Sequence, residues 1–148
     1  MSANQPTLGT SFQNVFGVVV TSLRSSRNPT VTQTELADYL GLAVSTWSRI
    51  ERGESAITLD QMLRVALFFG IPLSELLLKC EDIAQSLNEQ GIEVSISKSD
   101  IRNNNGVMPL SNAQVLSIAT VAGPIGWAAI GVFEAYKFLK SKTGKKSS

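Results

Sequence analysis

The chain of 148 residues contains no histidine and only one cysteine, Cys80. The lack of histidine removes the commonest general base and metal ligand. A single cysteine can form neither an intrachain disulfide nor a CxxC metal site. Because Cys80 has leucine and isoleucine neighbours, we expect its side chain to be a small buried apolar group and not a redox-sensing thiol. We therefore expect no metal ion and no cofactor.

The chain also lacks a strong excess of either charge, with a net charge of +1. Residues 1–58 carry four bases and four acids, residues 59–100 three bases and seven acids, and residues 101–148 six bases and one acid. The acidic residues are scattered and no nucleophile has a neighbouring base, so an enzyme is not expected. The N-terminus has no basic region followed by an apolar run. We therefore expect no secretory signal and a cytoplasmic location.

Apolar residues at helical spacing predict five helices within residues 10–90. Three of these helices have a capping box at their start: Thr10 with Gln13, Thr32 with Glu35, and Thr58 with Gln61. Glycines end the second, third and fourth helices at Gly41, Gly53 and Gly70. The first helix should end at Asn28-Pro29, and the fifth should run from Pro72 to about Gln90.

The composition changes beyond the fifth helix. Residues 92–97 alternate apolar and polar side chains, which predicts a short strand, and residues 99–106 form a polar linker. Residues 113–133 are uncharged and mostly apolar, and a lysine-rich tail follows them. The expected units are residues 10–90, residues 91–106 and residues 107–148. The fold class is mainly α: a five-helix bundle with one short strand and a helical, Gly/Ala-rich appendage.

The segment 32–53, TQTELADYLGLAVSTWSRIERG, reads as two short helices separated by Gly41. On a helical wheel of the second helix, polar, cationic and small side chains share one arc: Val44, Ser45, Ser48, Arg49 and Arg52. Trp47 and Ile50 lie on the opposite, apolar face. A helix that served only for packing would not need this arrangement.

This segment resembles the helix-turn-helix of the Cro and phage-repressor (XRE-like) family, and the resemblance extends over about residues 12–77. It implies that the third helix enters the major groove of double-stranded DNA. It assigns base reading to Val44, Ser45 and Arg49, and the shared arc adds Ser48. It places Gln33 on the phosphate backbone, where Thr32 and Arg52 are the other candidates.

Two features depart from the family pattern. Ala43 stands at the N-cap of the third helix, where Ser or Thr would satisfy a free N–H group. The turn from Ser25 to Val31 is longer than is usual in the family. Its length leaves open whether Arg24 or Arg27 pairs with Glu51.

The sequence therefore predicts a sequence-specific, DNA-binding transcriptional regulator, a dimeric repressor on a palindromic operator. The apolar stripe on the fifth helix and the strand at 92–97 are candidates for the dimer contact; alternatively, both complete the monomer core. The uncharged segment 113–133 favours packing or oligomerisation over membrane association, and a partner-binding role such as that of an antitoxin is a third possibility. The alternative function is a regulator whose C-terminal segment binds a membrane or a protein partner.

Overall fold

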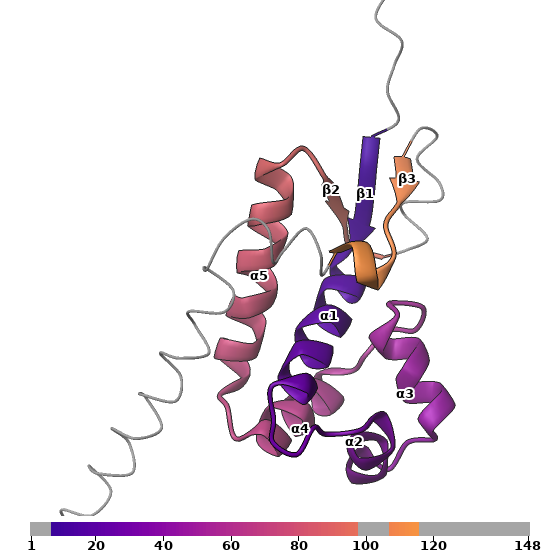
Figure 1. Ribbon diagram of the computed structural model, residues 1–148, viewed down its shortest axis with the longest axis vertical. Helices are drawn as coiled ribbons and strands as arrows, with labels where there is room; N and C mark the ends of the chain where they lie inside the picture. The colour runs from indigo at the N-terminus through magenta and orange to yellow at the C-terminus, as the bar shows by residue number, and fades with distance from the viewer. Residues whose placement is uncertain (1–6, 98–106, 116–148) are drawn as a thin grey trace, which may run out of the picture.

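The computed structural model describes residues 7–97 and 107–115, which form five labelled helices, three short strands and a further helical stretch at residues 112–115 (Figure 1). In chain order the elements are β1 (Thr7–Ser11), α1 (Phe12–Ser25), α2 (Gln33–Leu40), α3 (Val44–Glu51), α4 (Leu59–Phe69), α5 (Leu73–Glu89), β2 (Glu93–Ser95) and β3 (Val107–Pro109). The predicted mainly helical bundle is confirmed. The strands lie together at one end of α1, and α2 and α4 lie toward its other end.

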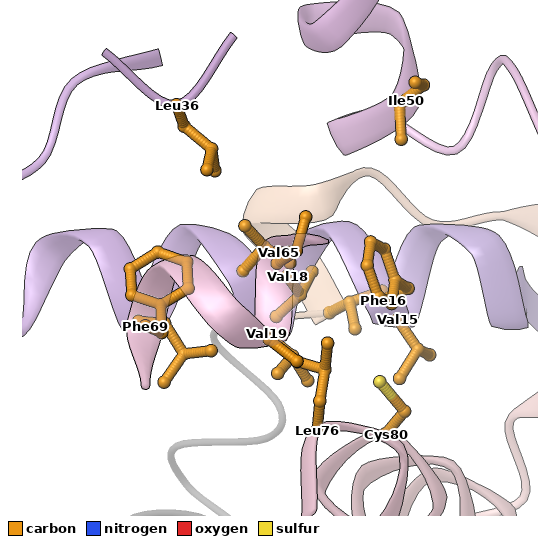
Figure 2. Close-up of a cluster of buried hydrophobic side chains, with 14 of the residues drawn as sticks. Val15, Phe16, Val18, Val19, Leu36, Ile50, Val65, Phe69, Leu76 and Cys80 are labelled. Carbon is orange, nitrogen blue, oxygen red and sulfur yellow. The ribbon is translucent and has the colours of Figure 1, made fainter. Parts of the chain in front are cut away.

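The hydrophobic core surrounds α1, which is buried on almost every side. Val15 and Val20 of this helix have no exposed surface, and Phe16, Val18 and Val19 are nearly as buried. Figure 2 shows side chains reaching α1 from opposite sides: Leu36 of α2 and Ile50 of α3 from one, and Leu76 and Cys80 of α5 from the other. A helix that is apolar on most of its faces belongs at the centre of a bundle.

Local capping decides where α2 and α4 begin and end, as the sequence predicted. Thr32 and Thr58 each form a complete capping box, with Glu35 and Gln61 respectively. Gly41 and Gly70 end these helices in the left-handed region, with φ of 69° and 68°.

The predicted start of α1 at Thr10 is wrong by one residue. Ser11 is the N-cap, and its hydroxyl accepts a hydrogen bond from the Asn14 N–H at 3.1 Å. Thr10 instead belongs to β1, where it pairs with Val94. Thr10 is therefore extended because a strand partner is present, a feature that lies far away in the sequence.

The three strands form a parallel sheet in the order β2-β1-β3. Thr10 pairs with Val94 of β2, and Leu8 pairs with Met108 of β3. The sequence predicted only the strand at 92–97, which is shorter in the structure and is joined by two strands that were not predicted. Both extra strands are short and have partners about 85 to 100 residues away, so neither carries a local signal.

Residues 107–115 belong to the bundle, although the sequence assigned them to a separate helical appendage. Residues 107–109 are a strand, and the buried side chains of Leu110 and Val115 join the main core. Only residues 112–115 of this stretch are helical. Most of the predicted apolar segment 113–133, and the whole lysine-rich tail, lie outside the described residues. Within the described ranges, no helix combines the length and apolarity that crossing a membrane requires.

The apolar stripe of α5 faces the core of the monomer. Leu76, Cys80 and Leu87 are fully buried. Burial raises the pKa of the Cys80 thiol to about 12. The sequence left open whether this stripe forms a dimer contact or completes the monomer core. In the structure it completes the monomer core.

Candidate nucleic-acid interface

Helix α3 has one exposed and one buried face. Trp47 is fully buried and Ile50 nearly so, and both anchor the helix to the core. Val44, Ser45 and Arg49 are exposed on the other side. The separation of faces that the helical wheel predicted is therefore present. As the sequence indicated, Ala43 makes no side-chain capping bond at the start of this helix.

The buried carboxylate of Glu51 fixes α3 to its neighbours. It accepts hydrogen bonds from Arg24 Nε at 2.8 Å and Nη2 at 3.0 Å, and from Trp47 Nε1 at 2.7 Å. Gln33 Nε2 donates to it at 2.6 Å, and the Thr21 hydroxyl lies at 3.4 Å. One acidic side chain thus ties together α1, α2 and α3. A buried carboxylate requires such saturation by donors, because an unpaired buried charge is strongly destabilising.

The structure resolves which arginine pairs with Glu51. Arg24 forms the ion pair with Glu51. Arg27 instead donates to the Phe69 carbonyl at 2.6 Å and lies over the Phe69 ring, 5.5 Å from its centroid. Arg24 of α1 and Arg27 of the turn that follows therefore make separate structural contacts.

Close backbone packing sets the position of α3 against α1. A Cβ atom added at Gly17 would lie 1.7 Å from the Glu51 carbonyl oxygen. Any side chain at this position would force the two helices apart. An isolated glycine within an apolar helical pattern can signal such an approach, but the sequence did not identify the helix that it meets.

The predicted base-reading residues differ in whether their side chains already form hydrogen bonds or ion pairs within the chain. Arg49 is exposed, and its guanidinium forms no ion pair or hydrogen bond with any residue in 7–97 or 107–115, although its backbone carbonyl accepts from the Glu54 N–H. Ser48 is half-buried, and its hydroxyl accepts a hydrogen bond from Arg52 Nη1 at 2.8 Å. The structure brings Val44, Ser45 and Arg49 together on a surface that is accessible to a ligand.

The residues predicted to contact the phosphate backbone all have partners within the chain. Arg52 donates to the Glu54 carboxylate at 3.1 and 3.2 Å, and these bonds raise the pKa of Arg52. The Thr32 hydroxyl belongs to the capping box, whose hydrogen bonds lower the pKa of Glu35. The amide of Gln33 uses one N–H group on Glu51 and keeps a second for other acceptors.

Sequence reasoning missed a contact between the C-terminal stretch and α3. Asn112 Nδ2 donates to the Glu51 carbonyl oxygen at 2.5 Å, across 61 positions of the chain. A cavity of about 460 Å³ lies beside this contact, with Gln33, Arg52 and Asn112 among its lining residues. No local pattern around Asn112 signals a role at the helix, because its partner is a main-chain atom brought there by the sheet.

Comparison with known proteins identifies a helix-turn-helix in the same region. The model of a family described as helix-turn-helix matches residues 29–76. These residues form a helix-turn-helix of the Cro/C1 (XRE-like) type. Domains of this family are DNA-binding regulatory domains and not catalytic ones. No match was found among the curated proteins or among the solved structures.

The matched helix-turn-helix covers less than half of the chain. It contains α2, α3 and α4 with the first turn of α5, and it leaves out α1, the rest of α5 and all three strands. The elements outside it form the other half of the core and hold α3 through Arg24, Gly17 and Asn112. The helix-turn-helix is therefore supported by parts of the chain that the family model does not cover.

Proposed function

We propose that this protein is a sequence-specific, double-stranded DNA-binding transcriptional regulator that acts as a dimeric repressor on a palindromic operator. The observation that carries the proposal is the exposed face of α3 within a helix-turn-helix. A major groove about 12 Å wide admits one such helix. The cytoplasmic location stays a prediction.

Base reading is proposed for Val44, Ser45, Ser48 and Arg49. Arg49 has a free guanidinium within the described part of the chain, and a guanidinium can donate two hydrogen bonds to guanine O6 and N7. Val44 offers an apolar contact for a thymine methyl group. Ser45 can donate or accept and so discriminates less between bases. The strongest base preference should therefore come from Arg49.

Phosphate contacts are proposed for the start of α2 and for Arg52. The second amide N–H of Gln33 and the main-chain N–H groups at this helix start can donate to a phosphate, beside Thr32. Arg52 can exchange Glu54 for a phosphate at low cost, because an exposed ion pair contributes little. With so few cations, affinity should depend only weakly on salt concentration.

Selection of binding sequences from random duplex DNA tests this proposal with the full chain. The wild-type protein should select a sequence with twofold symmetry. Arg49→Ala should weaken binding to it by about 1–3 kcal/mol and relax one base position. Gln85→Ala, at an exposed position of α5 outside the matched segment, is the control and should bind as the wild type does. An Arg49→Ala variant with wild-type affinity and preference would show that the recognition face is wrongly assigned.

A second candidate function is favoured by the contact of Asn112 with α3. In this reading, a protein partner or a membrane that engages the chain beyond residue 115 changes DNA affinity by moving residues 107–115. Separation of cell extracts into cytosol and membrane shows which fraction holds the protein. DNA titrations of the protein with and without the membrane or protein partner that it binds then test this candidate. Equal DNA affinity in both states would contradict it.

A further inference from the structure

Helix α4 exposes a line of leucines that no other described element covers. Leu59, Leu63 and Leu67 are 66%, 45% and 61% exposed. Residues four apart lie one above another on a helix, so the three side chains form a single ridge. The opposite side of α4 already serves the core through Val65, Ala66 and Phe69. The ridge is therefore apolar surface beyond what the monomer needs.

The other dimer contacts that the sequence suggested do not offer such a surface. The stripe of α5 is inside the monomer core. Strand β2 has only three residues, and all three are half-buried. Among the described residues, the leucine ridge of α4 is the regular apolar surface that remains for a second copy.

We propose that the leucine ridge of α4 packs against the same ridge of a second copy, with the two α4 helices antiparallel about a twofold axis at Leu63. This rests on the proposed function, since a palindromic operator requires two copies. A twofold contact is self-complementary. With Leu63 on the axis it meets its own counterpart, and Leu59 meets Leu67 of the second copy. The equal spacing on either side of Leu63 fits this register.

Charge complementarity supports the antiparallel arrangement. Asp60 and Arg64 are the only charged residues of α4, and they form an exposed ion pair at 3.0 Å on one flank of the ridge. In the antiparallel register this flank lies on the same side in both copies. Measured along the helix axes, Asp60 of one copy then lies about 3 Å from Arg64 of the other copy. An arginine side chain can span this offset. A parallel contact would place the two flanks on opposite sides.

The same charges argue against a membrane as the occupant of the ridge. Helices that lie on anionic membranes carry several lysines or arginines beside their apolar face. Helix α4 carries one arginine, which an aspartate neutralises. A second copy presents the matching acid and base, whereas a lipid surface presents neither in this arrangement.

Sedimentation of the full chain over a range of concentrations tests the contact. Leu63→Asp should weaken the dimer at least tenfold, because it buries two like charges on the axis. It should leave the helical circular dichroism spectrum unchanged, because the side chain is already half-exposed. Ile96→Asp is the matched control, since Ile96 is 82% exposed and follows β2, at the sheet end of the molecule. An unchanged dimer in Leu63→Asp, or a wild-type chain that stays monomeric, would overturn the proposal.

Disulfide trapping tests the register. After mild oxidation, Leu63→Cys should give a covalent dimer by itself. Leu59→Cys and Leu67→Cys should each fail alone and cross-link when mixed. Cys80 is fully buried and does not compete. Cross-linking of Leu59→Cys to itself would indicate a parallel contact and overturn the antiparallel one.

Charge exchange and vesicle binding complete the test. Asp60→Arg should weaken the dimer by placing like charges across the contact, and the double variant Asp60→Arg with Arg64→Asp should restore it.

The membrane alternative is tested with phosphatidylserine vesicles. If the wild-type chain is monomeric and binds these vesicles, and if Leu63→Asp abolishes this binding, the ridge belongs to a membrane and the proposal is overturned. Failure of the proposed function has a separate readout: a wild-type dimer that selects no DNA sequence.

Discussion

The helix-turn-helix at residues 29–76 and the sheet with residues 110–115 contrast in how their structure is encoded. In the first region, caps, glycines and apolar spacing within a few residues specify each helix. In the second, three short strands acquire their structure from partners far away in the chain. Helix α3 belongs to the first region, and the second region nevertheless contacts it through Asn112. The surface proposed to bind DNA therefore depends on a part of the chain that has no local signature.

The largest effect should come from removing the sheet's last strand and the turn after it. A chain ending at Arg102 lacks β3 together with Leu110 and Val115, whose burial contributes about 3–6 kcal/mol. Its free energy of unfolding should fall by this amount relative to a chain ending at Val115, as measured by urea denaturation. Equal stability of the two truncated chains would show that the rest of the fold does not need β3 and the residues that follow it.

Trp47→Ala tests the helix-turn-helix side of the comparison. The indole is fully buried and donates to Glu51, so its removal should cost about 3–5 kcal/mol. Thermal unfolding followed by circular dichroism measures the loss. The variant should keep the wild-type base preference at temperatures where it is folded. A change of preference without a change of stability would contradict the division of α3 into two faces.

Asn112→Ala isolates the link between the two regions. It removes one hydrogen bond to the Glu51 carbonyl and should cost about 1 kcal/mol of stability. If the sheet region positions α3, operator affinity should also fall slightly, as a fluorescence titration with labelled duplex would measure. Ala113→Ser changes the next residue, which is exposed and has no side-chain hydrogen bond to lose, and serves as the control. Wild-type stability and affinity in Asn112→Ala would remove the proposed link.

The smallest effect should appear only at high pH and concerns α5, which joins the two regions. The pKa of Cys80 is raised to about 12 in the folded chain from an ordinary value of 9.0. The unfolded state therefore loses this proton first, so stability should fall as the pH rises from about 9 toward 12. Cys80→Ala should be less stable at neutral pH and should show a shallower pH dependence. An identical dependence in both proteins would contradict the burial of the thiol.

The sequence predicted the five helices closely, including the capping boxes at Thr32 and Thr58 and the outward position of Arg49. Each depends on contacts within one or two helical turns, which a pattern of neighbouring residues records. It placed the start of α1 at Thr10 because a threonine followed by Gln13 looks like a cap. Pairing of Thr10 with Val94 overrides this local preference, and Ser11 becomes the cap.

By itself, the sequence determined which residues form the helices and which side of α3 is polar, because helical periodicity and capping are local properties. Only the tertiary structure decided that Arg24 pairs with Glu51, that α1 meets α3 at Gly17, and that Asn112 reaches the end of α3. These contacts join residues that are 27, 34 and 61 positions apart in the sequence. They depend on how the helices and the sheet pack together, and no short stretch of sequence specifies that packing.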